Sequence, residues 1–237
     1  MWEPSTGRYP VDVIRQRRHP AATQGTARLE AFTDGVFAIA ATLLVLDLTT
    51  HQLGEVESDA QLRGALGGMA QLFFNFALSF VLLCLLWMVH VRQFEHIARV
   101  DAMLLWLNSA RLLFIVLVPF ATGLTTEYSE YLAGRLAMPV TFFLAILFGT
   151  LEWAWARRRR DVLMPDVDET DAAAQGRGSL SALLLSAGSV VVAPWIGSAG
   201  FLLFALDGPL TRKLEGRRAA DAPAGPADPG ARDERTR

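Results

Sequence analysis

The 237-residue chain has a single cysteine, Cys84, so no disulfide framework can form within one copy. Charged side chains make up only 19% of the residues, which is less than a soluble domain of this size usually carries, and the formal net charge is -2. Without a basic excess, the chain has no electrostatic footprint for nucleic acid. Residues 1–27 contain no apolar run followed by a cleavage site, which argues against a secretory signal peptide there.

Sequence motifs for catalysis are missing as well. There is no HExxH pair, no paired cysteine motif and no glycine-rich phosphate loop. His90, Glu95, His96 and Asp101 can mimic a set of metal ligands, but positions i and i+6 are not well aligned on one helix face. A solvated helix end is therefore the favoured interpretation, and we expect no enzyme activity, no cofactor and no resident metal.

What the chain does contain is long apolar blocks, which account for most of its 52% hydrophobic residues. The first block, residues 28–48, reads RLEAFTDGVFAIAATLLVLDL and has the length that a helix needs to cross a hydrocarbon core about 30 Å thick. Asp34 then lies at the inner edge of the membrane, where an ionisable side chain is costly and requires a partner or a function. The block predicts a polytopic membrane protein with a functional first helix.

The fold class predicted from all the blocks is an all-α membrane protein with six transmembrane helices and no soluble domain. The predicted spans are 28–50, 69–91, 101–123, 133–156, 179–195 and 197–213. The last two are short and contain Gly188, Pro194, Gly197 and Gly200, so a re-entrant hairpin is the alternative there.

The remaining segments are polar. We expect residues 1–27 to form a cytoplasmic N-terminal lead-in, 28–213 the six-helix transmembrane domain, and 214–237 a disordered cytoplasmic tail. The acidic segment 161–178 is predicted to be a mobile loop. The composition of the segment 51–68 predicts an extracellular loop.

Basic residues fall on one side of the six predicted spans. They lie in the lead-in, in the loop after the second span, at the end of the fourth and after the sixth: Arg15, Arg17, Arg18, Arg92, Arg99, Arg157, Arg158, Arg159, Arg160, Arg212, Lys213, Arg217 and Arg218. The opposite loops are acidic, and 51–68 holds only Arg63. Because cytoplasmic loops are enriched in Lys and Arg, both termini are predicted to be cytoplasmic in a multi-pass protein of the cell membrane.

Within the first span, Ile39, Leu43, Leu46 and Thr50 fall on one narrow stripe at 100° per residue, with Thr42 at its shoulder. Periodicity alone is equally typical of a lipid-facing or packed helix. Asp34 faces elsewhere, and we expect it to accept hydrogen bonds from Arg28, His90 and Thr33, as a latch between helices. Arg111, near the middle of the third span, also needs an acid or a water-filled crevice, and Glu152 is its candidate partner.

The start of the first span resembles a known signature. Arg28-x-x-x-Phe32-Thr33-Asp34, followed by GVFAIAATLLVLDL, is similar to the RxxxFSD motif that opens the first helix of the transmembrane protein 175 family of potassium channels, with threonine in place of serine. The resemblance continues through Trp87, His90 and Phe94, through Leu107-Asn108, and through Pro119-Phe120.

This resemblance implies a six-helix subunit that assembles as a homotetramer in membrane lipid, with the first helix lining a central pore. Ile39 would form the tightest apolar ring and Leu43 and Leu46 further rings, while Thr42 matches the hydroxyl position that favours potassium over sodium. The implied function is passive conduction of potassium ions with modest selectivity over sodium. The alternative is a secondary transporter or exporter of a small ion or solute, although the inverted repeats typical of transporters are not found.

Overall fold

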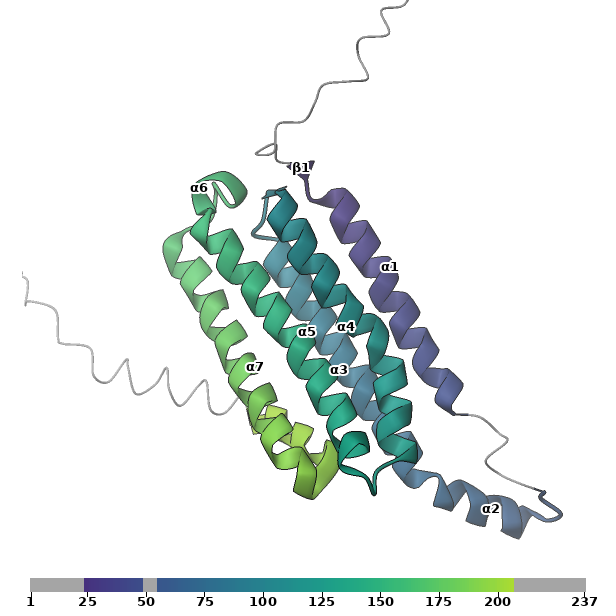
Figure 1. Ribbon diagram of the computed structural model, residues 1–237. Coiled ribbons are helices and arrows are strands. Elements are labelled where there is room, and N and C mark those ends of the chain that lie inside the picture. The colour runs from purple at the N-terminus through teal and green to yellow at the C-terminus, as the bar shows by residue number, and fades with distance from the viewer. Residues whose placement is uncertain (1–23, 49–54, 207–237) are drawn as a thin grey trace, which may run out of the picture.

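The computed structural model describes residues 24–48 and 55–206, and these are almost entirely helical (Figure 1). Within these residues, five helices are long and apolar enough to cross a membrane. The elements, in chain order, are β1 (Gln24–Gly25), α1 (Ala27–Leu43), η2 (Leu44–Asp47), α2 (Asp59–Gly68), α3 (Ala70–Phe94), β2 (Arg99–Val100), α4 (Ala102–Glu127), α5 (Leu132–Arg158), α6 (Arg160–Leu163), α7 (Glu169–Ile196) and η4 (Gly197–Leu206). Of the lead-in 1–27, the structure describes only the last four residues, in which β1 pairs antiparallel with β2. The tail 214–237 lies outside the described residues.

The first four predicted spans correspond to α1 with η2, α3, α4 and α5. The fifth becomes the longer helix α7, and its apolar window continues into η4. The chain reverses between α7 and η4 at Gly197, whose φ of 58° is a backbone conformation that favours glycine. η4 then folds back against α7, where the Ser189 hydroxyl donates to the Gly200 carbonyl at 3.2 Å. Residues 207–213 of the predicted sixth span lie outside the described residues, so the six-helix count stays a prediction.

Two segments expected as loops contain helix. In 161–178, α7 begins at Glu169, because the Asp168 carboxylate accepts the Glu169 backbone N–H at 2.7 Å and caps the helix. The expectation of a mobile loop was therefore wrong for most of this segment. In 51–68, Ser58 caps α2, which extends away from the bundle and has no buried residue (Figure 1). Both helices begin directly after a capping residue, Ser58 or Asp168. The charged composition of the two segments favoured a loop and did not indicate these helix starts.

The bundle is built on the extensive contact between α4 and α5, with α7 against α5 on one side and α1 against α3 and α4 on the other (Figure 1). One apolar core, around Phe37, Leu83, Ile115 and Phe142, joins α1, α3, α4 and α5. A second core lies at the end where β1 and β2 pair, and includes Leu104, Trp153 and Leu163. This packing places α1 at the edge of the subunit, attached by one face.

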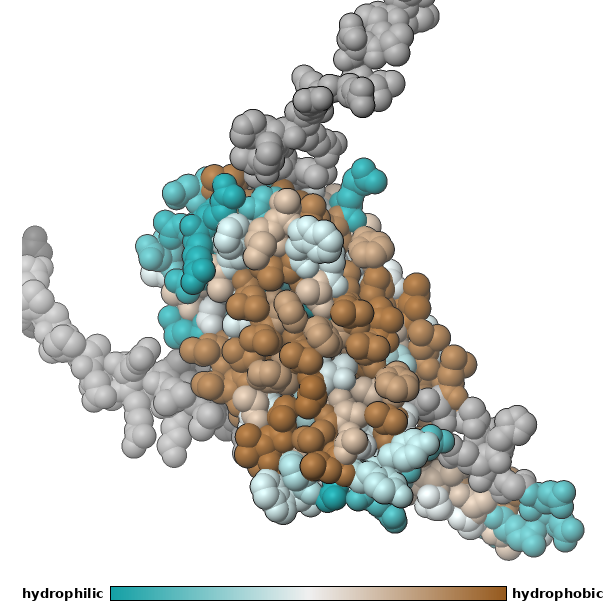
Figure 2. Space-filling view, viewed as in Figure 1, coloured by the Kyte–Doolittle hydropathy of each residue, from teal (hydrophilic) through white to brown (hydrophobic). Residues whose placement is uncertain are grey.

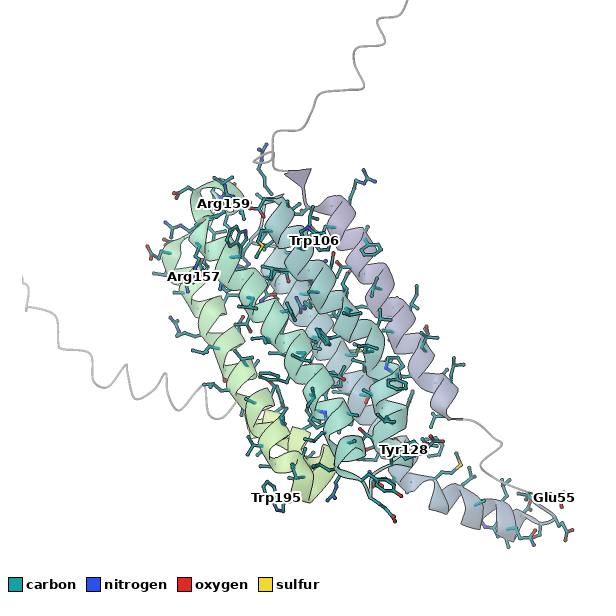
Figure 3. All side chains as sticks on the ribbon, viewed as in Figure 1. Glu55, Trp106, Tyr128, Arg157, Arg159 and Trp195 are labelled. Atoms are coloured by element: carbon teal, nitrogen blue, oxygen red, sulfur yellow. The ribbon has the colours of Figure 1, made fainter. Side chains whose placement is uncertain are left out.

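The surface has an apolar band between two polar ends (Figure 2). Exposed apolar side chains of every long helix contribute to this band, as expected for a protein surrounded by hydrocarbon. Figure 3 shows Arg157, Arg159 and Trp106 near one end of the bundle and Glu55, Tyr128 and Trp195 near the other. The exposed tryptophans of the two ends suit the two membrane–water interfaces.

A buried ion pair holds the middle of the bundle together. Arg111 on α4 and Glu152 on α5 are each 1% exposed, and Arg111 Nη1 lies 3.3 Å from Glu152 Oε2. Arg111 also donates to the Leu86 carbonyl oxygen at 3.1 Å and to Gln93 Oε1 at 3.3 Å, so one guanidinium group joins α3, α4 and α5. Glu152 is thereby confirmed as the partner of Arg111.

The ion pair yields a prediction on stability. Glu152→Leu should lower the free energy of unfolding by about 3–5 kcal/mol, because it leaves the buried Arg111 charge without its counter-charge. The double variant Arg111→Met/Glu152→Leu should lose much less, since it leaves no uncompensated charge. Unfolding of the detergent-purified protein measures both, with the exposed Arg63→Met as control. A double variant as unstable as the sum of its two single variants would contradict this account.

Candidate pore-lining helix and its anchors

The two faces of α1 differ in what they contact. Its buried face consists of residues three or four positions apart, which pack against α3 and α4: Leu29, Thr33, Phe37, Ala40 and, at the start of η2, Leu44. The opposite face holds the predicted stripe. Ile39 is 61% exposed and Leu46 64%, and Thr42 and Leu43 are exposed as well. The stripe is therefore excluded from the packing of its own subunit.

Thr50 of the predicted stripe lies outside the described residues, and among the described members Thr42 is the one with a polar side chain. Its hydroxyl donates to the Ile39 carbonyl oxygen at 2.9 Å, one turn earlier. This bond uses the hydroxyl proton and turns the hydroxyl oxygen into an acceptor on the exposed face. Within the described residues, no donor contacts that oxygen. The arrangement gives the apolar stripe one oxygen that can accept from water or contact a cation.

Thr33 attaches α1 to α4. Asn108 Nδ2 donates to Thr33 Oγ1 at 2.9 Å, and both side chains are fully buried. Removing one member of a hydroxyl–amide pair in an apolar core costs more free energy than the hydrogen bond itself contributes, because the remaining group is left buried without its partner. Asn108 belongs to the segments that resemble the family, but the sequence alone assigns it no contact. No sequence pattern linked it to a residue so far away in the chain.

Asp34 has a different partner from those we expected. Trp87 on α3 donates its indole N–H to Asp34 Oδ1 at 2.8 Å, so Asp34 does join two helices. Neither Arg28 nor His90 is hydrogen-bonded to it in the part of the chain that the structure describes. Thr33 faces Asn108 instead of its neighbour, because consecutive residues on a helix point 100° apart. The structure thus shows Asp34 in contact with a second helix through Trp87, a donor other than the three we expected.

His90 lies on the buried side of α3 and is 1% exposed. Its ring packs against Phe94, with ring centroids 4.3 Å apart, and against Phe37 of α1, at 6.1 Å. Its Nδ1 is 3.5 Å from Arg111 Nη1, which connects it weakly to the buried ion pair. His90 thus supports α1 by packing. Among the described residues, no three His, Cys, Asp or Glu side chains come together as candidate metal ligands.

These features describe a multi-pass helical membrane protein whose first helix exposes an apolar stripe and is pinned on its other face by two polar contacts. Residues 28–119 match the family described as the endosomal/lysosomal potassium channel TMEM175. A potassium channel of Chamaesiphon minutus is 36% identical over 153 residues, which cover 62% of this chain and 74% of that protein. The chain belongs to the TMEM175 family.

Other relatives are more distant or matched over less of their length. A potassium channel of Streptomyces collinus is 33% identical over 137 residues, 56% of this chain and 65% of that protein. The human protein named as the endosomal/lysosomal proton channel TMEM175 is 29% identical over 175 residues, 70% of this chain. The chain spans about a third of that protein's length, because the match covers 34% of it.

Solved structures support the fold. The crystal structure of a lysosomal potassium-selective channel TMEM175 homologue from Chamaesiphon minutus superposes with a TM-score of 0.62 at 26% identity, over 79% of this chain and 97% of that one. A variant of the potassium channel MtTMEM175 gives a TM-score of 0.56 at 18% identity, over 82% of this chain and 93% of that one.

The contact between Trp87 and Asp34 is directly testable. Trp87→Phe keeps an aromatic ring and removes the indole N–H, so it should destabilise the folded protein by about 1.5–3 kcal/mol, as for a hydrogen bond to a charged group. Trp106→Phe is the matched control, because Trp106 is exposed and has no hydrogen-bond partner among the described residues. It should change stability by less than about 0.5 kcal/mol. Equal unfolding midpoints for the two variants would contradict the latch.

Proposed function

We propose that this protein is a passive cation channel that conducts potassium ions with modest selectivity over sodium. The observation that carries the proposal is the exposed apolar stripe of α1, which lies inside the segment matched to the channel family. Potassium as the permeating ion follows from the names of the bacterial relatives, whereas the animal relatives are named as proton channels.

The channel would be a homotetramer in which four copies of α1 surround a central axis. Two observations support this assembly. The first is the position of α1 at the edge of the bundle, where its stripe can meet copies of itself (Figure 1). The second is an apolar groove of about 360 Å³ between α1 and α3, whose small lining residues Ala38, Ala41 and Cys84 leave room for a neighbouring helix.

The stripe would form the constriction that limits ion passage through this pore. Four Ile39 side chains on one axis make a ring that can exclude water, and dewetting of such a ring is an accepted gate. Leu43 and Leu46 would add rings towards the outer end, and the Thr42 oxygen would offer a polar contact beside them. A partly dehydrated cation passes when the rings part, and potassium loses its hydration shell at less cost than sodium. Such a filter gives weaker selectivity than a cage of carbonyl oxygens.

In the cell membrane, both termini would face the cytoplasm. The end of the bundle that carries β1 also carries the arginines that follow α5, whereas the α2 end carries Glu55, Glu57 and Asp59 (Figure 3). The positive-inside rule then places the β1 end in the cytoplasm. The acidic end would face outward, at the entrance to the pore.

Ion flux from proteoliposomes tests the function. A potassium gradient should drive a flux that grows with the gradient without saturating, and planar bilayers should show single-channel steps. Saturable flux coupled to a second solute, without steps, would identify a transporter and overturn the proposal. A proton gradient alone, with potassium replaced by an impermeant cation, would show whether protons carry the current instead. The mass of the detergent-purified particle should equal four subunits.

Ile39→Asn tests the constriction. An amide on each of four subunits would wet the ring, so the variant should raise single-channel conductance several-fold and lower the ratio of potassium to sodium permeability. Val191→Asn is the matched control, because Val191 is 65% exposed on α7, far from α1. Unchanged currents in the Ile39 variant, or equal changes in both variants, would remove Ile39 from the pore.

A further inference from the structure

A polar hollow of about 230 Å³ lies where α5 ends and α7 begins. It is lined by Arg157, Arg158, Arg160, Asp161, Glu169 and Ala172. Figure 2 shows this region as a hydrophilic cluster at one end of the bundle, directly beside the apolar band. The proposed pore uses none of these residues, so the charges of the hollow call for a separate explanation.

Two of the three arginines in the hollow are unpaired. Arg160 lies 3.5 Å from Glu169, which neutralises both charges. The neighbouring Arg159 turns away and pairs with Asp101 at 3.1 Å. Arg157 and Arg158 have no hydrogen bond or ion pair with any described residue. Asp161 is the second acid of the hollow, so its lining keeps an excess of one positive charge.

The walls of the hollow are fixed by buried contacts. Trp153, on α5, donates its indole N–H to the carbonyl oxygen of Ala172, on α7, at 3.3 Å. Leu163 and Met164 bury the turn between the two helices. Arg157 lies against α7 at Gly176, where a Cβ would come 3.1 Å from its Nη1, so a larger residue there would require the arginine side chain to shift. The arginines therefore project from a rigid corner of the fold.

The hollow also lies close to exposed apolar surface on both of the helices that form it. On α7, the exposed Leu180 and Leu184 lie about two and three helical turns beyond Ala172. On α5, the exposed Leu151 lies about two turns before Arg157. An acyl chain can therefore lie along these leucines while its phosphate reaches the arginines. A soluble anion would gain nothing from the apolar surface.

We propose that this hollow binds the phosphate of an anionic phospholipid of the cytoplasmic leaflet, with Arg157 and Arg158 as its donors. Guanidinium groups bind phosphate oxygens in a bidentate manner, and basic clusters at the cytoplasmic ends of membrane helices attract anionic lipids. The volume is sufficient, since a water molecule takes about 30 Å³ in the liquid and 230 Å³ therefore equals roughly eight waters. Binding would tie the α5–α7 corner to the inner leaflet.

Native mass spectrometry of the detergent-purified protein tests the proposal without reference to ion conduction. The protein is titrated with phosphatidylglycerol, with phosphatidylcholine and with inorganic phosphate. The test variant is Arg157→Gln/Arg158→Gln. The matched control is Arg63→Gln/Arg92→Gln, which removes the same charge from two exposed arginines outside the hollow.

We expect wild type to prefer phosphatidylglycerol to phosphatidylcholine. The test variant should bind phosphatidylglycerol about tenfold or more weakly, and the control variant within about twofold of wild type. Equal losses in the two variants would mean general surface charge and would overturn the site. Displacement of phosphatidylglycerol by millimolar phosphate would assign the hollow to a soluble anion and would overturn the proposal that its ligand is a lipid. A wild type without lipid preference would overturn the proposal whether or not the variants fold.

Discussion

The structure depends on one constraint: a polar group inside the hydrocarbon core has no water to bind and must find its partner within the protein. Several buried polar side chains of this chain meet that constraint in pairs that join different helices. Arg111 pairs with Glu152 between α4 and α5, Thr33 with Asn108 between α1 and α4, and Ser79 with Thr122 between α3 and α4. Lipid tails are as apolar as the side chains of the helices, so apolar contacts alone give little preference for one neighbouring helix over another. These polar pairs therefore determine which helices are neighbours.

The same constraint explains why α1 is attached by one face only. Its polar contacts and its core residues all meet α3 and α4, and its remaining surface has nothing to pack against in the subunit. An isolated helix face with large apolar residues is stable in lipid, but a carboxylate beside it is not. The indole of Trp87 satisfies Asp34 and thereby lets the stripe stay exposed. The exposure of that face follows from how the opposite face is anchored.

The sequence alone predicted much of this arrangement, and its errors have physical causes. Span positions and the pairing of Arg111 with Glu152 followed from apolar length and from the cost of a buried charge. The partner of Asp34 did not follow, because hydropathy fixes the depth of a residue and leaves the rotation of each helix open. The start of α7 was missed because its first turns are polar, and capping by Asp168 outweighed composition there. The site residues on the stripe stay predictions, since their contacts would be made between copies.

The residues of the signature lie on both faces of α1, and the two groups have different surroundings. Thr33 and Asp34 make the contacts that hold α1, while Phe32 is 62% exposed. Phe32 precedes Ile39 by seven residues, about two helical turns, so it lies in register with the stripe. A motif that fixed only the attachment would not need an aromatic residue on the free face. The signature thus contains residues of both sides of one helix: those that anchor it in its subunit, and an aromatic residue on the face that stays exposed.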